Sequence, residues 1–275
     1  MTIVERNRNQ NIDLIRGFAI IIVVLGHAIQ ATMMNGDKSW LWEIIKSFQM
    51  PLLFLVSGFT AGYSYPKVYK DHFTFIYKKI KRLLIPYIVW AMIHYLLVCC
   101  AGTGYRTFSL NSLLYELFIS DFWFLRYLFV FFLVLWGCNE LLSMLHLLYW
   151  KVYAGGALLV ATGLIVILDK VPVMTESVSL MYWFYFVLGW MFYQNLQSNV
   201  AKFIYNNKVA NKMVIMGSFC GVIGCGYVIA SKLVISLLMG IPMTVFCFVF
   251  LYYSFGSFEN RMCNGLLCLG RAKLL

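Results

Sequence analysis

The sequence predicts an all-α protein, a polytopic bundle of about eight transmembrane helices with both termini in the cytoplasm. Of its 275 residues, 62% are hydrophobic and 12% are charged, whereas an average soluble domain is about 45–50% apolar and about 25% charged. The apolar runs are about 15 to 23 residues long and apolar on every face, which is typical of membrane helices and not of alternating barrel strands. Together with the distribution of charge, this excludes a water-soluble globule and a disordered chain.

The predicted spans follow the apolar runs, because backbone amides in hydrocarbon must bond within the protein. In chain order the runs predict helices at residues 17–34, 48–64, 83–101, 122–138, 152–168, 179–193, 213–230 and 233–255. Before the third span, residues 73–82 predict an amphipathic surface helix with Lys78, Lys79, Lys81 and Arg82 available to water or phosphate. No repeat or linker divides the chain, so residues 1–275 are expected to form one integral-membrane domain.

The placement of charge predicts the orientation. The net charge of +11 arises from 22 Lys and Arg against 11 Asp and Glu. Alternate loops place 16 basic residues on one side and five on the other, and Arg126 falls inside a span. By the positive-inside rule, the side with more basic residues is cytoplasmic. Topology therefore explains the charge, and nucleic acid is not an expected partner.

Two further patterns concern processing and metals. A cleaved signal peptide is the competing interpretation of the N-terminus, but the long run, His27 within it and the lack of a clear small-x-small site favour a retained first span. The eight cysteines form no CxxC pair, so neither a disulfide framework nor a metal site is expected. They are expected to be small packing residues.

The first span carries the strongest candidate residues for chemistry. Polar groups inside a bilayer are costly, so each one is a functional candidate. Asp13 and Arg16 precede the apolar run and His27 lies within it. Arg16 and His27 are eleven residues apart, which places them on one helix face about 16 Å apart along the axis. Alternatively, Arg16 is a boundary arginine and His27 a histidine hydrogen-bonded within the bundle.

Other motifs follow in a fixed order. After Gly26-His27 come a Ser-Phe-Gln-Met-Pro segment that leads to Ser57-Gly58, then Lys79-Ile-Lys-Arg82 before Leu-Leu-Ile-Pro, and then Phe-Trp123-Phe-Leu-Arg126. This ordered set resembles acyltransferase family 3, the integral-membrane O-acyltransferases, and most closely its fucose 4-O-acetylase-like branch. The resemblance is strong over residues 9–130 and weaker through Gly189 to the end.

The resemblance implies roles for individual residues. In that family the Arg-x10-His arrangement is regarded as essential, and it falls here on Arg16 and His27, with Asp13 beside them. The family's Arg-x-x-Arg pair matches Lys79 and Arg82. Ser57-Gly58 is expected to serve close helix packing and not nucleophilic catalysis. Relatives usually have about ten spans, so we expect a naturally short member, a truncated product or an inactive remnant.

The first functional hypothesis is an O-acetyltransferase of a bacterial-type inner membrane. It would take acetyl from cytoplasmic acetyl-CoA and modify a hydroxyl of a cell-envelope sugar, with membrane lipid and envelope carbohydrate as partners. The CoA phosphates would meet Arg16, Lys79 and Arg82, and His27 would be the base. The expected acceptor contacts are Trp123, Arg126 and Asp121. For Arg126, structural pairing with Asp121 or Glu116 is an equal alternative.

Two other classes of function stay open at this point. In a glycan or lipid transporter or flippase, Arg16, Arg126 and His27 would line a permeation path. The absence of detectable inverted repeats and of paired broken spans counts against this class. A non-catalytic membrane partner is the third hypothesis, and the short C-terminus leaves it open.

Overall fold

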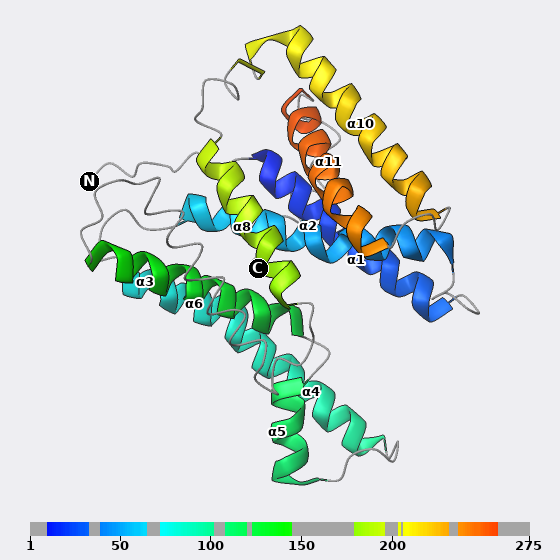
Figure 1. Cartoon of the computed structure of the whole chain (residues 1–275). Coiled ribbons are helices and arrows are strands. Elements are labelled where there is room, and N and C mark those ends of the chain that lie inside the picture. Colours follow the sequence, from blue (N-terminus) through cyan, green and yellow to red (C-terminus); the bar gives the residue numbers. More distant parts are fainter. Residues whose placement is uncertain are drawn as a thin grey trace. The chain divides into compact units, whose positions relative to one another are not determined.

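The computed structural model describes residues 10–32, 39–64, 72–101, 108–119, 123–144, 179–195, 203–204, 206–230 and 236–257. Its elements are helices (Figure 1), and no strand occurs within these ranges. In chain order they are α1 (Gln10–Thr32), α2 (Trp40–Ser64), α3 (His72–Lys79), η3 (Ile80–Leu84), α4 (Ile85–Cys100), α5 (Leu110–Ile119), α6 (Trp123–Met144), α8 (Ser179–Asn195), α10 (Lys208–Ala230) and α11 (Ser236–Ser257). The all-α prediction is confirmed.

Several helices are long and apolar enough to cross a membrane. In the described part of the chain these are Asn11–Thr32, Trp40–Gly62, Phe73–Cys100 and Lys208–Ile229, while Trp123–Gly137 and Gly240–Ser254 are shorter apolar helices. Each overlaps a predicted span, and several begin up to ten residues before it. Span 179–193 corresponds to α8, and span 152–168 lies outside the described residues. The chain is a multi-pass membrane protein, and its number of spans and the sides of its termini stay predictions.

The predicted surface helix and the predicted third span belong to one continuous helix. Helices α3, η3 and α4 follow one another without a break over Phe73–Cys100, and which part of this helix lies at the membrane surface stays a prediction. The η3 segment is a π-helical turn that ends just before Pro86. Proline cannot donate to the carbonyl four residues earlier and its ring collides with it. A widened turn accommodates both constraints, and hydropathy alone does not reveal it.

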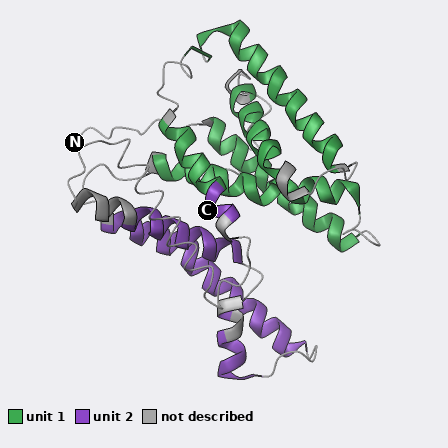
Figure 2. Ribbon diagram, in the orientation of Figure 1, with its two compact units in different colours: residues 1–63, 185–272 green, residues 64–184, 273–275 purple. Residues whose placement is uncertain are grey.

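The chain divides into two compact units, shown in different colours in Figure 2. Unit 1 comprises Met1–Tyr63 and Tyr185–Ala272, and unit 2 comprises Ser64–Phe184 and Lys273–Leu275. Each unit is described by itself. That the whole chain forms one integral-membrane domain stays a prediction.

Unit 1 is organised around α2. Every residue from 51 to 59 is buried, and glycines bring the backbones of α2 and α8 together. A methyl group on Gly58 would overlap the carbonyl of Phe186, and one on Gly189 would overlap the carbonyl of Leu55. The close packing predicted for Ser57-Gly58 is confirmed.

The other helices of unit 1 pack beside this pair. Helices α10 and α11 form an antiparallel pair (Figure 1), and α1 packs against α11. The side chain of Phe246 fills the space where a side chain at Gly221 would lie. At the start of α1, Asn11 Nδ2 donates to the carbonyl of Tyr252 at 3.3 Å. This bond fixes the start of α1 to the last part of α11.

Unit 2 has an aromatic core. Leu83, Phe131 and Trp183 are almost fully buried, and the rings of Phe131 and Trp183 meet edge to face at 5.3 Å. Tyr87 of α4 donates to the carbonyl of Leu117 in α5. This bond is one of the contacts that hold α5 against α4, together with the bond from the Tyr95 hydroxyl to the carbonyl of Ser109, the residue before α5.

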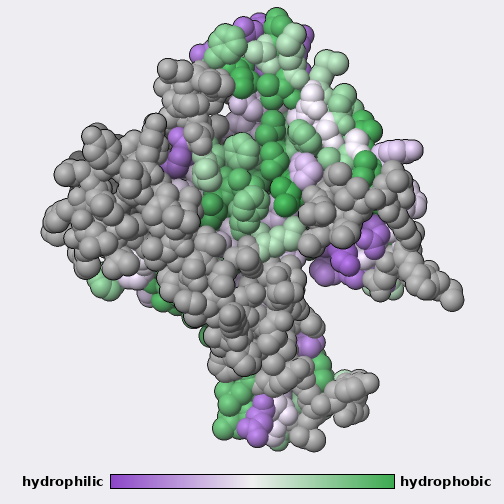
Figure 3. Space-filling view, viewed as in Figure 1, coloured by the Kyte–Doolittle hydropathy of each residue, from purple (hydrophilic) through white to green (hydrophobic). Residues whose placement is uncertain are grey.

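The outer faces of the helices are apolar. Hydrophobic residues, green in Figure 3, cover much of the described surface. They include large side chains of α4 and α10, namely Ile85, Ile88, Val89, Met92, Ile93, Leu96, Leu97, Met213, Met216, Phe219 and Ile223. A soluble protein rarely exposes so much continuous apolar surface. Acyl chains of lipid fit these faces.

We expect Gly58→Ala to destabilise the protein, because the new methyl group would meet the Phe186 carbonyl, which belongs to the backbone and cannot rotate away. Overpacking of this kind typically costs about 1–3 kcal/mol. Thermal unfolding of the detergent-solubilised protein measures the loss. Gly217→Ala is the matched control, since no described atom lies within 4 Å of its added carbon. Equal melting temperatures for the two variants would contradict the close crossing.

Candidate functional site

The polar centre of unit 1 begins with two residues of α1. Arg16 Nη1 lies 3.8 Å from Asp13 Oδ1, and the two side chains are 13% and 4% exposed. Their spacing of three residues places them on one side of the helix. Asp13 lies in the first turn of α1, where the helix dipole also favours a negative charge. The sequence predicted both residues, and the structure brings them together.

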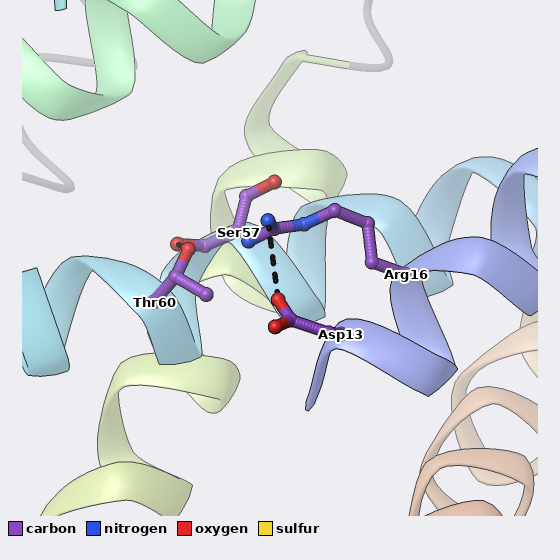
Figure 4. Close-up of polar contacts among 4 residues, drawn as sticks. All are labelled: Asp13, Arg16, Ser57 and Thr60. Carbon is purple, nitrogen blue, oxygen red and sulfur yellow. Dashed lines mark hydrogen bonds and ion pairs between the residues drawn. The ribbon is translucent and has the colours of Figure 1, made fainter. Parts of the chain in front are cut away.

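Helix α2 lies beside this pair (Figure 4). Figure 4 shows Ser57 and Thr60 of α2 facing Asp13 and Arg16 of α1. Ser57 is buried, and the Thr60 hydroxyl donates to the Ser57 carbonyl at 2.9 Å. We call these four residues the Asp13–Arg16 cluster. Gly58 crosses α8 directly beside it, so the packing of α2 also determines where the cluster lies.

The cluster is an energetically demanding feature. Removing two charges from water costs several kcal/mol per ion, and their attraction offsets this only when the geometry and the remaining hydrogen bonds are good. A hydrophobic pair could fill the same volume without that cost. Charged groups kept at such positions in membrane helices are therefore functional candidates.

His27 lies on the same helix but not within the cluster. Its position eleven residues after Arg16 places it about 16 Å further along the axis, and its side chain is exposed. In the described ranges, no hydrogen bond or ion pair engages the His27 ring. The alternative of a histidine hydrogen-bonded within the bundle gains no support from these residues.

In unit 2 the two residues of the predicted basic pair, Lys79 and Arg82, have different surroundings. The Lys79 ammonium lies 3.5 Å from the ring centroid of Phe132 and 5.2 Å from that of Phe75. Arg82, on the π turn, is exposed. The Lys79 charge lies over aromatic rings, an attraction that sequence spacing does not reveal, and its availability to water or phosphate stays a prediction. Contact of either residue with phosphate stays a prediction.

The predicted acceptor residues Trp123 and Arg126 both lie in the first turns of α6. The Trp123 ring stacks on Tyr182 at 5.2 Å. Arg126 Nε and Nη1 are buried and have no hydrogen-bond partner among the residues that the structure describes, although the guanidinium carbon lies 5.5 Å from the Tyr127 ring centroid. Asp121 lies outside the described residues, so neither its pairing with Arg126 nor its contact with substrate is tested.

Metal ligation finds no support in the described ranges. They contain no group of three or more His, Cys, Asp or Glu side chains close enough to hold a metal ion.

One functional candidate was missed in the sequence. Gln49 of α2 is 6% exposed, and its Oε1 has no hydrogen-bond partner within the described part of the chain. It faces Gly26, the residue before His27. The sequence could have shown it, because an amide within an apolar span is costly to bury, and this is the reason for which Asp13 and His27 were selected.

Comparison with known protein families decides the wider identity. The family model for the acyltransferase domain of acyltransferase family 3 matches residues 9–269. The chain belongs to acyltransferase family 3. The resemblance drawn from the motifs is thus confirmed for the family, while its fucose 4-O-acetylase-like branch stays a prediction.

Two curated relatives carry the same printed name. The nodulation protein NolL of Sinorhizobium fredii is 26% identical over 228 residues, which cover 80% of this chain and 56% of that protein. NolL of Mesorhizobium japonicum is 27% identical over 137 residues, covering 47% of this chain and 35% of that protein. This acyltransferase family 3 chain therefore spans about half the length of the first of them. No solved structure matches it.

We expect Arg16→Gln alone to destabilise the protein by about 3–5 kcal/mol, because it leaves the buried Asp13 carboxylate without its ion-pair partner. Asp13→Asn in the same chain removes that charge, so the double variant should recover much of the loss. Thermal unfolding and the yield of folded protein in detergent measure both. A double variant no more stable than Arg16→Gln would show that the two charges are not coupled.

Proposed function

We propose that this member of acyltransferase family 3 transfers acetyl from cytoplasmic acetyl-CoA to a hydroxyl of a cell-envelope sugar, in a bacterial-type inner membrane. The observation that carries the proposal is the arrangement on α1. A buried arginine–carboxylate pair lies near the start of the helix, and an exposed imidazole lies about three turns further along. The family match over residues 9–269 supports acyl transfer as the reaction.

His27 is the proposed general base. A sugar hydroxyl has a pKa far above 7, so it attacks a thioester slowly unless a base removes its proton. An imidazole nitrogen of His27 takes that proton as the hydroxyl oxygen bonds to the thioester carbonyl carbon. The carbon–sulfur bond then breaks, and the CoA thiolate leaves with the proton returned by the imidazolium. The exposed His27 ring suits this role because substrate can reach it.

Arg16 and Asp13 are proposed to serve the donor. Arginine has five N–H donors in a rigid fork, and the ion pair engages one nitrogen at 3.8 Å. The planar, bidentate guanidinium group suits a phosphate oxygen of CoA, which arginine binds well. Asp13 would then act through Arg16, by fixing the direction in which the guanidinium points.

Unit 2, taken by itself, also carries residues that we propose to contact substrate. Lys79 and Arg82 supply positive charge that suits the CoA phosphates. Trp123, Arg126 and Asp121 are proposed acceptor contacts. The buried donor atoms of Arg126 support this proposal, because a polar ligand would satisfy them.

We expect His27→Ala to lose about 10²- to 10⁴-fold in acetyl transfer, the usual effect of removing a positioned base. His27→Gln should lose nearly as much, since an amide cannot take up a proton at neutral pH. Transfer of labelled acetyl from acetyl-CoA to envelope polysaccharide is measured in membranes and corrected for the amount of protein. Wild-type protein that transfers no label would refute the proposed function.

The control for His27 is Val24→Ala, an exposed residue of the same helix. It should retain transfer, and all three variants should unfold near the wild-type temperature, since surface substitutions usually change stability by less than about 0.5 kcal/mol. Near-normal transfer by His27→Gln would remove His27 from the proton transfer.

We expect Arg82→Ala to raise the KM for acetyl-CoA with kcat nearly unchanged, as for any loss of ground-state binding. Lys79→Met removes the charge and keeps an apolar chain against Phe75 and Phe132. It should also raise the KM for acetyl-CoA if the Lys79 charge contacts CoA. Phe132→Leu removes the ring below the ammonium while keeping the lysine charge. If Lys79→Met and Phe132→Leu alter only the melting temperature, Lys79 is a packing residue and does not bind the donor.

A further inference from the structure

Gln49 lies deep within a membrane-length helix. It is the tenth residue of α2, about 14 Å from the start of the helix, in the candidate span Trp40–Gly62. Its side chain is 6% exposed. An amide at this depth has little water to bond with.

Gly26 creates the space that the amide occupies. A carbon added to Gly26 would lie 2.5 Å from Gln49 Oε1, 3.0 Å from the Trp42 ring and 3.1 Å from Ile45. The carboxamide therefore rests directly against the backbone of α1, one residue before His27. Any residue with a side chain at position 26 would displace it or its neighbours.

Within the described ranges, the surroundings of this amide oxygen are mostly apolar. Beside it is an apolar cluster made of Ile29, Trp42, Ile45, Ile22 and Leu41. Gln49 Oε1 is buried and accepts no hydrogen bond from any residue in the described ranges. Buried acceptors of this kind are rare, and each calls for an explanation. A ligand that donates a hydrogen bond is one.

We propose that Gln49 is an acceptor-binding residue, whose Oε1 accepts a hydrogen bond from a hydroxyl of the sugar acceptor bound beside His27. This rests on the proposed function and assigns part of its substrate site. Gln49 Oε1 needs a partner that donates a hydrogen bond. A sugar carries several hydroxyl groups that can donate, whereas the carbonyl of the reacting thioester has no hydrogen to donate. Gly26 leaves room for the Gln49 amide, and it is the residue directly before His27, the proposed base.

The test compares two variants that remove the same contact in different ways. Gln49→Leu removes the acceptor atom at similar volume, and Gly26→Ala keeps the amide but displaces it. Both should weaken binding of an envelope oligosaccharide, prepared from cells lacking this gene, by about ten-fold, the usual effect of one hydrogen bond. Both should also raise the KM for that oligosaccharide to a similar extent and leave the KM for acetyl-CoA unchanged.

Stability and a control variant separate binding from folding. Gln49→Leu should unfold at or above the wild-type temperature, because it replaces an unsatisfied polar group by an apolar one. Gly217→Ala, on the outer face of α10, should leave oligosaccharide binding unchanged. Binding is measured on the detergent-solubilised full chain without acetyl-CoA, so it reports on Gln49 even if no acetyl transfer is found.

Three results would overturn the inference. Wild-type affinity for the oligosaccharide in Gln49→Leu would show that the amide does not contact it. A raised KM for acetyl-CoA alone would assign the amide to the pantetheine arm, which carries N–H donors. A lowered kcat with a shifted pH profile, at constant oligosaccharide affinity, would mean that Gln49 orients His27. Failure of the wild type to transfer acetyl while Gln49→Leu still weakens binding would instead refute only the proposed reaction.

Discussion

The backbone crossing of α2 and α8 is the contact on which unit 1 depends. Without side chains at Gly58 and Gly189, each helix presses a carbonyl, that of Leu55 or Phe186, against the other. Apolar side chains gain little by associating in lipid, so close packing of small residues must hold such helices together. The crossing buries residues 51–59 of α2. It thereby holds Ser57 in place beside the charged residues of α1.

The same constraint accounts for the polar residues of α1. A charge in a membrane helix is tolerated when the protein supplies a partner. Arg16 and Asp13 supply each other, three residues apart, and the hydroxyl-bearing face of α2 lies beside them (Figure 4). His27 differs, since it is exposed on the described structure and no described residue holds its ring. The two charged residues of α1 thus form an internal ion pair, whereas His27 has no partner among the described residues.

Much of the fold could be predicted from the sequence, because span length and hydropathy are local properties. The pairing of Asp13 with Arg16 was also accessible, since helical spacing places them together. The π turn before Pro86, the position of Lys79 over Phe132 and the placement of Gln49 against Gly26 were not predicted. Each depends on a neighbour distant in sequence or on backbone geometry that has no hydropathy signal. The features missed in the sequence are therefore mostly packing contacts between helices.

The polar groups of α1 are charged near the start of the helix and uncharged further along, and the parts of the proposed substrates that they would contact differ in the same way. The charged pair lies near the start of the helix, where the predicted topology places the cytoplasm and the anionic part of acetyl-CoA. Further along the helix, the polar groups are an imidazole and a facing carboxamide. A neutral sugar hydroxyl and a thioester need no counter-charge there, and an ion at that depth would cost far more than these groups do. The bilayer and the proposed chemistry thus favour the same order of residues, with formal charge confined to the cytoplasmic end and hydrogen-bonding groups placed at depth.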